Sequence, residues 1–152
     1  VRTHFPDAES GAGVATGAIA QGMVVAEKLD LPYCYVRPKP KGHGLGNQIE
    51  GQIIKGSKVV VVEDLISTGG SSLKAVKALR EHGCKVVGMV AIFTYGFSLA
   101  EKNFEEAGCQ LITLSDYDNL IPQAVSSGYI SDDTVSTLKS WRLDPDKWQG
   151  NP

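Results

Sequence analysis

The sequence predicts an α/β fold in which a central, mostly parallel sheet is flanked by helices. Short apolar runs, clearest at residues 59–62 and 85–93, alternate with stretches whose apolar residues recur at helical spacing. The distance between successive runs suits right-handed strand–helix–strand crossovers, which make neighbouring strands parallel. With 152 residues, 42% of them hydrophobic and 21% charged, the chain is expected to form one domain spanning residues 1–152.

Composition narrows the class of protein further. The net charge of -2 gives no reason to expect a nucleic-acid partner. No apolar run approaches the length of a membrane span and no signal peptide is visible, so no membrane partner is expected. The three cysteines, Cys34, Cys84 and Cys109, lie in or beside apolar runs. They are expected to be reduced core thiols of a cytoplasmic protein, not disulfide partners or zinc ligands.

The chain begins with a predicted strand–helix–strand unit. The small apolar residues 11–15 predict a strand that enters a turn at Thr16-Gly17, and residues 33–36 predict the next strand. The helix between them is expected to end before Pro32, because a residue that precedes proline disfavours the helical backbone. Its buried face is expected to carry Ile19, Met23, Ala26 and either Val25 or Leu29.

A basic, glycine-rich stretch follows at residues 37–47, with the sequence RPKPKGHGLGN. Its two prolines disfavour a helix, and its three glycines favour a mobile backbone. Four potential cations suit a polyphosphate that must be enclosed away from water. The stretch therefore predicts a lid over a ligand, and the alternative is a solvated basic loop. Residues 48–54 are expected to add an extended segment.

Residues 59–72, with the sequence VVVVEDLISTGGSS, carry the most specific pattern in the chain. The β-branched run predicts a buried strand, which Glu63 and Asp64 follow directly. A loop of small residues from Ser67 to Ser71 comes next, and a helix is expected from about Leu73. Because ligands of open parallel sheets bind outside the carboxyl ends of strands, the acids and the loop are expected to face a ligand.

The chemistry of this loop favours a phosphorylated sugar. Glycines allow close backbone approach, and successive N–H groups beside a helix N-terminus can hold a phosphate. No lysine follows Gly70, so the loop is not a Walker A motif. Glu63 and Asp64 suit hydroxyl donors such as a sugar diol, or a divalent cation. Together they predict a ribose 5-phosphate site, and the alternative is a flexible loop beside solvated turn acids.

The remaining elements are expected to complete the fold. The helix after the loop should bury Leu73, Ala75, Val76 and Leu79 and end at Gly83. After the strand at 85–93, Ser98 and Glu101 predict a capping box for a helix that ends at Gly108. The buried side of that helix should carry Leu99, Ala100, Phe104 and Ala107. A strand at 109–114 and helices at about 120–127 and 131–140 follow. Trp141 and Trp148 are expected to anchor the tail, the alternative being base stacking.

The stretch at 59–72 resembles the phosphoribosyl-diphosphate (PRPP) signature of type I phosphoribosyltransferases. The match is closest to bacterial orotate phosphoribosyltransferases, since residues 37–44, RPKPKGHG, resemble their catalytic loop. The resemblance runs from about Gly11 to Gly96 and more loosely to the C-terminus. It implies a Rossmann-like type I phosphoribosyltransferase fold and the transfer of ribose 5-phosphate from PRPP to orotate. The products are orotidine 5′-monophosphate and pyrophosphate, in UMP biosynthesis.

The resemblance also implies roles for particular residues. Lys41 is the key catalytic lysine, Ser67 also touches orotate, and Mg²⁺ is a cofactor without dedicated protein ligands. A homodimer is implied, in which the loop reaches the neighbouring subunit's site. The residues implied to bind PRPP are Arg37, Lys41, His43, Glu63, Asp64, Leu65, Ile66, Ser67, Thr68, Gly69, Gly70 and Ser71.

The chain departs from the family pattern at three places. Thr16-Gly17-Ala18-Ile19 stands where a pyrophosphate-binding turn commonly has Thr-Ala-Gly-Ile, and Pro38 replaces a lysine that some members carry. The N-terminal hood segment is absent before Val1, so a fragment, a processed form and a shortened form are all considered. The competing functions are a purine or uracil phosphoribosyltransferase, a non-catalytic PRPP-sensing regulator and a PRPP-binding fragment.

Overall fold

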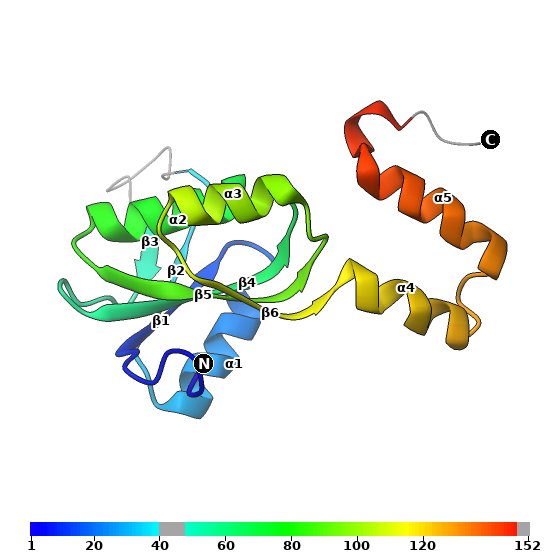
Figure 1. Ribbon diagram of the computed structural model, residues 1–152. Helices are drawn as coiled ribbons and strands as arrows, with labels where there is room; N and C mark the ends of the chain where they lie inside the picture. The colour runs from blue at the N-terminus through cyan, green and yellow to red at the C-terminus, as the bar shows by residue number, and fades with distance from the viewer. Residues whose placement is uncertain (40–47, 149–152) are drawn as a thin grey trace.

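A six-stranded sheet organises the molecule, in the order β3-β2-β1-β4-β5-β6 (Figure 1). The computed structural model describes residues 1–39 and 48–148. Every neighbouring pair of strands is parallel except β2 and β3, which are antiparallel. The predicted, mostly parallel sheet is therefore confirmed. The strands are β1 (Ser10–Val14), β2 (Tyr33–Val36), β3 (Ile49–Gly51), β4 (Lys58–Ile66), β5 (Lys85–Thr94) and β6 (Leu111–Asp116).

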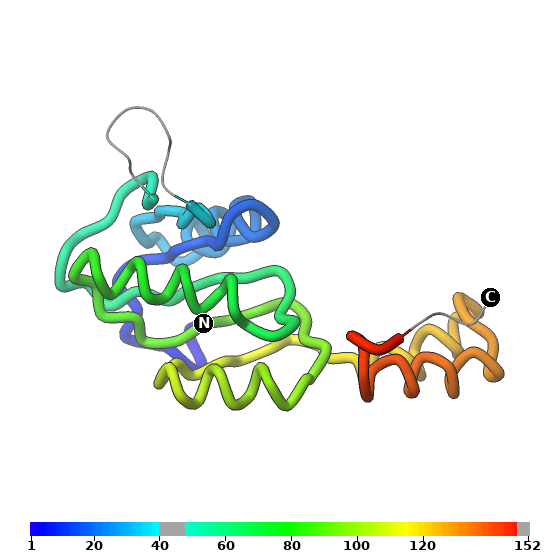
Figure 2. The backbone as a smooth tube through the Cα atoms, turned by 90° about the horizontal axis from the view of Figure 1, so that it is seen from above, coloured from blue at the N-terminus to red at the C-terminus, as the bar shows by residue number. Residues whose placement is uncertain are grey.

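Helices cover both faces of this sheet. In Figure 1, α2 and α3 lie on one face and α1 lies on the other. The view in Figure 2 shows α4 and α5 as a pair that extends beyond the end of β6. Within the described parts of the chain, no helix is long and apolar enough to cross a bilayer. The helices are α1 (Ile19–Leu29), α2 (Gly70–Glu81), α3 (Ser98–Glu106), α4 (Tyr117–Ser126) and α5 (Asp132–Leu143), with a short 3₁₀ turn at Pro145–Lys147.

The core forms around β4, because that strand is covered on both faces. Val59, Val60 and Val61 are fully buried, as the near-continuous apolar run predicts for a central parallel strand. On one face of the sheet α2 buries Ala75, Val76 and Leu79, as expected. The three cysteines are free and buried, which agrees with the prediction of core thiols.

The first helix packs more closely than its sequence indicates. Gly22 and Ala26 form its buried contact, and a Cβ at Gly22 would lie 3.1 Å from the Gly13 Cα. Because these small residues face the sheet, Met23 is turned about 100° away from them. The expectation that Met23 is buried is therefore wrong, since its side chain is 55% exposed.

Several predicted boundaries are wrong as well. Strand β4 continues through both acids to Ile66, and α2 already begins at Gly70. Ser98 does not cap α3, because it lies inside the helix, whose N-cap is Phe97. Leu99 is 51% exposed, because the buried stripe of this helix passes through Ala100 and Phe104 instead.

An aromatic cluster joins the last two helices to the end of the sheet. Tyr95 stacks on Phe97 and meets Trp141 edge-on, with ring centroids 5.5 Å apart in each pair. Tyr117 lies 5.7 Å from Trp141 and beneath the Arg142 guanidinium. Arg142 also donates to the backbone oxygens of Tyr95 and Gly96. Trp141 is thus an anchor of the C-terminal part, as the sequence predicts.

Candidate active site

The two acids of β4 lie at the carboxyl edge of the sheet but are not equivalent. Successive side chains of a strand point to opposite faces, so Glu63 and Asp64 diverge. Glu63 is only 5% exposed, whereas Asp64 is half-buried. The structure therefore brings one accessible carboxylate and one buried carboxylate to the same strand end.

Glu63 is held by hydrogen bonds on both of its oxygens. Oε2 accepts from the Ser72 hydroxyl at 2.8 Å, and Oε1 accepts from the Asp64 N–H at 3.1 Å. Burial raises the pKa of Glu63 to about 7, because it disfavours the charged form, and the hydrogen bond from Ser72 opposes this rise. The sequence pattern did not single out Ser72, because a serine in a helical stretch carries no sign of its partner.

Asp64 lies against the turn after β1. Its Oδ1 accepts from the Leu65 N–H at 2.7 Å. A Cβ built on Gly17 would collide with Asp64 Oδ2, so the carboxylate approaches the backbone where only a glycine leaves room. The glycine at the second position of Thr16-Gly17-Ala18-Ile19 therefore permits this approach. The structure thereby brings together the turn and the acid, which the sequence placed in separate motifs.

The small-residue loop between β4 and α2 is short and supported from α3. Ser67 and Thr68 are exposed, and Gly69 has a φ of 79°, a left-handed conformation that favours glycine. The Asn103 amide donates to the Thr68 carbonyl at 2.9 Å. A Cβ at Gly69 would lie 2.7 Å from the Phe104 ring. Asn103 and Phe104 of α3 therefore support the loop on one side, and Ser67 and Thr68 stay exposed to solvent.

The start of α2 can accept an anion. Among the described residues, no side chain caps its amino end. The first backbone N–H groups of a helix have no partner within the helix, and its dipole favours negative charge there. Gly70 and Ser71 at this end are exposed, so a ligand could reach the predicted phosphate site. Of the other residues implied to bind PRPP, Leu65 is 39% exposed but the Ile66 side chain is fully buried in the core.

Arg37 follows β2 at the same edge, two strands away from β4. Its Nη1 donates to Glu50 Oε1 at 3.0 Å, and Tyr35 donates to the other Glu50 oxygen. The structure thus places Arg37 at the beginning of the basic stretch. Lys41 and His43, which the resemblance assigns to PRPP, lie outside the described residues.

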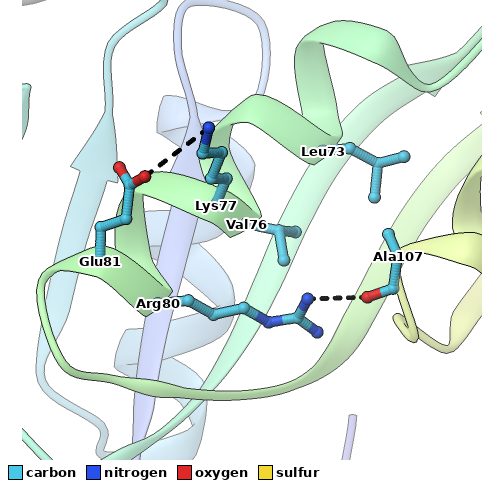
Figure 3. A pocket seen from close by; sticks show the side chains of 6 residues that line it. All are labelled: Leu73, Val76, Lys77, Arg80, Glu81 and Ala107. Carbon is cyan, nitrogen blue, oxygen red and sulfur yellow. Dashed lines mark hydrogen bonds and ion pairs between the residues drawn. The ribbon is translucent and has the colours of Figure 1, made fainter.

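Two cavities accompany these elements. One of ≈ 1220 Å³ is bordered by Ser67 and Thr68, by the turn after β5 and by the pair α4–α5. The other, of ≈ 540 Å³, lies between α2 and α3 (Figure 3). In Figure 3, Arg80 points across that second cavity to the Ala107 carbonyl, to which it donates at 2.7 Å. Because the described residues that line the second cavity include no predicted site residue, we assign only the first cavity to the candidate site.

Comparison with known proteins identifies the family. A family model described as a phosphoribosyl transferase domain matches residues 12–126. An orotate phosphoribosyltransferase from Cytophaga hutchinsonii is 58% identical over 149 residues, which cover 98% of this chain and 71% of that protein. The chain belongs to the orotate phosphoribosyltransferase family. The resemblance to orotate phosphoribosyltransferases that the sequence indicates is therefore confirmed at the level of the family.

Similarity to further proteins supports the assignment of this chain to the orotate phosphoribosyltransferase family. The enzyme of that name from Porphyromonas gingivalis is 58% identical over 144 residues, covering 95% of this chain and 69% of that protein. Among solved structures, the orotate phosphoribosyltransferase from Aeropyrum pernix has a TM-score of 0.69 at 31% identity. That match covers 82% of this chain and 67% of the other. The type I phosphoribosyltransferase fold is therefore established for this chain.

Proposed function

We propose that this chain catalyses the transfer of ribose 5-phosphate from PRPP to orotate. The products are orotidine 5′-monophosphate and pyrophosphate, and the reaction serves UMP biosynthesis. The observation that carries the proposal is the meeting of Asp64, the turn at Gly17 and the open end of α2 at one sheet edge. A phosphate site next to a hydroxyl-accepting acid fits a ribose 5-phosphate, and membership of the family supports orotate as the acceptor.

In this reaction the C1′–oxygen bond to pyrophosphate breaks and a bond from C1′ to an orotate nitrogen forms. The transition state resembles an oxocarbenium ion, as in glycoside chemistry. We assign the ribose hydroxyls to Asp64, and the 5′-phosphate to residues 67–71. Glu63, which the resemblance also implies for the ribose, is buried and bonded to Ser72 in this structure, so it would have to exchange that bond to reach a hydroxyl. The leaving pyrophosphate is assigned to Lys41, assisted by Arg37 and His43. Binding of this kind lowers the barrier by orientation and by charge stabilisation.

Orotate is assigned to the part of the larger cavity that Ser67 borders. That position places the base beside the loop that holds the ribose phosphate, as a displacement at C1′ requires. The resemblance that implies a contact between Ser67 and orotate supports the same position.

Mg²⁺ is part of the proposal as a cofactor. Among residues 1–39 and 48–148, no three acidic, histidine or cysteine side chains group as metal ligands. A magnesium ion bound through PRPP oxygens and water would need no dedicated protein cage. Bound in that way, the ion would neutralise charge on the leaving pyrophosphate. The side chains of this chain would then bind and orient the sugar and its phosphates.

A homodimer and a cytoplasmic location complete the proposal. In the dimer, residues 37–47 of one subunit would serve the site of the other, as the resemblance implies. Buried, free cysteines support a reducing compartment.

A steady-state assay tests the proposed function. The chain is incubated with orotate, PRPP and Mg²⁺, and the loss of orotate absorbance is followed. Turnover that requires both PRPP and Mg²⁺ is expected. Binding of PRPP without turnover would instead establish a phosphoribosyl site that lacks a competent base pocket. The absence of both binding and turnover would overturn the proposal.

A further inference from the structure

Ser72 is a buried polar residue to which the proposed reaction gives no role. It lies in the first turn of α2 and is 1% exposed. Its hydroxyl donates to Glu63 Oε2 at 2.8 Å, and Glu63 is itself buried. A hydrogen bond to a carboxylate that water barely reaches is stronger than one at the surface.

This hydrogen bond bridges the loop of residues 67–69 that connects β4 to α2. Strand β4 ends at Ile66 and α2 begins at Gly70, so only three residues separate the two elements. The β4 side of this junction is already tied to β5, because the Tyr95 N–H donates to the Ile66 carbonyl at 3.1 Å. The bond between Glu63 and Ser72 ties the α2 side to the same strand.

We propose that Ser72 is a positioning residue of the phosphoribosyl site. By bonding to Glu63 it holds the first turn of α2 at a set distance from β4. It thereby fixes the spacing of the loop and helix N–H groups that receive the 5′-phosphate. This inference rests on the proposed function, since it assigns the loop to the phosphate of PRPP.

The orientation of Glu63 depends on the same bond. Within residues 1–39 and 48–148, its other oxygen accepts from the N–H of the next residue, Asp64, which moves with the strand. Ser72 is therefore the contact that relates the Glu63 carboxylate to a second element. Loss of this contact should alter ligand binding more than it alters the chemical step, because the 5′-phosphate does not react.

Ser10 provides a matched control. It is also 1% exposed, and its hydroxyl donates to the Pro32 carbonyl at 3.1 Å. It lies at the start of β1, at the amino-terminal ends of the parallel strands, whereas the loop lies at their carboxyl ends. Ser10→Ala therefore removes a buried hydroxyl and a hydrogen bond without touching the proposed site.

The experiment compares Ser72→Ala, Ser72→Cys and Ser10→Ala in the full chain. Steady-state kinetics give kcat and the KM for PRPP, and calorimetry gives the Kd of ribose 5-phosphate. We expect both Ser72 variants to raise KM and Kd roughly tenfold while kcat changes less than about threefold. Ser10→Ala should leave all three values within about twofold of the wild type. Cysteine keeps the side-chain volume but donates weakly, so it separates the lost bond from a cavity.

A Glu63→Ala background shows whether Ser72 acts through Glu63. In that background, Ser72→Ala should change the Kd of ribose 5-phosphate by less than about twofold, because the bond is already lost. A full tenfold effect there, or Ser72 variants that behave like Ser10→Ala, would overturn the inference. Failure of the wild-type chain to bind ribose 5-phosphate would overturn the proposed function instead, so the two failures are distinguishable.

Discussion

Glu63 is an acid that the fold keeps almost entirely out of water. Its charged form loses hydration, and two hydrogen bonds replace only part of that loss. In the folded protein the pKa of the Glu63 carboxyl is therefore raised to about 7, from an ordinary value near 4.5. The residue thus changes charge near neutral pH, where an unburied carboxyl would already be ionised.

This shift links stability to pH. Between pH values of about 4.5 and 7 the folded chain binds more protons than the unfolded chain, so the free energy of unfolding falls as the pH rises. The full loss amounts to about 3 kcal/mol. Glu63→Gln removes the ionisation and should remove this slope. Urea unfolding of both proteins between about pH 5 and pH 8 measures it, and equal slopes would contradict the assignment.

Lys41 is the residue on which the proposed chemistry depends most. Its ammonium is expected to stabilise charge that develops on the leaving pyrophosphate, so Lys41→Ala should lower kcat by about 100-fold or more. The Kd of PRPP should rise by less than about tenfold, since other groups hold the ribose and its phosphate. Lys39→Ala, which removes a charge from the same stretch, is the control. Near-normal turnover by Lys41→Ala would exclude the catalytic role.

Single residues also show the limits of prediction from sequence. The type of site could be predicted, because the acids and small residues adjoin in the chain. The burial of Glu63 could not, because it depends on the hydrogen bond to Ser72 nine residues later. The collision between a Cβ at Gly17 and Asp64 is a contact across two strands, which local pattern does not encode.

At the scale of elements, strands β2 and β3 precede and follow the basic stretch and pair with each other. The Arg37 N–H donates to the Gln48 carbonyl at 2.8 Å, and the Gln48 amide donates back to the Arg37 carbonyl at 3.0 Å. Glu50 on β3 accepts from both Tyr35 and Arg37. This arrangement holds the two ends of the stretch together and directs the Arg37 side chain.

Glu50→Ala should therefore weaken PRPP binding. The ion pair with Arg37 is partly exposed, so its loss should cost no more than about 1 kcal/mol of stability. The KM for PRPP should nevertheless rise about threefold to tenfold, because Arg37 loses the group that orients it. Kinetics of Glu50→Ala beside Tyr35→Phe, which keeps the ion pair, measure this effect. A lower KM would show instead that Glu50 competes with PRPP for Arg37.

Element types were easier to predict than element ends. The run of valines predicts a buried strand at β4. In the structure, pairing with β5 extends this strand through Glu63 to Ile66. Leu65 and Ile66 pair with Phe93 and Thr94. Such pairing depends on the tertiary structure, so the local sequence pattern does not predict it. Similarly, Ser98 and Glu101 fit a capping box, yet the turn after β5 places Phe97 at the cap.

At the scale of the whole molecule, α4 and α5 connect to the sheet through few contacts of high specificity. The cluster of Tyr95, Tyr117 and Trp141 joins residues that are far apart in sequence. Arg142 adds backbone hydrogen bonds and an ion pair with Asp118. Of these residues, Tyr117, Asp118 and Arg142 line the larger cavity, so the C-terminal part shapes the space assigned to orotate.

The proposed homodimer makes a prediction about mixed subunits. If residues 37–47 serve the partner's site, a Lys41→Ala subunit still offers an intact Asp64, and an Asp64→Asn subunit still offers an intact Lys41. Each variant alone should be nearly inactive. In a hybrid dimer of the two, one of the two sites combines both intact residues, since a two-fold axis exchanges the same elements between subunits.

Equal amounts of the two variants, mixed and allowed to exchange, should produce hybrids as half of the dimers. Activity should then recover to about a quarter of the wild-type value per subunit, since each hybrid has one intact site of two. Two separate preparations of Lys41→Ala, mixed and exchanged in the same way, are the control and should recover nothing, because no subunit supplies Lys41. Activity that stays at the sum of the two separate variants would mean that each subunit completes its own site. Recovery above that sum would require Lys41 of one subunit and Asp64 of the other to meet in a single site.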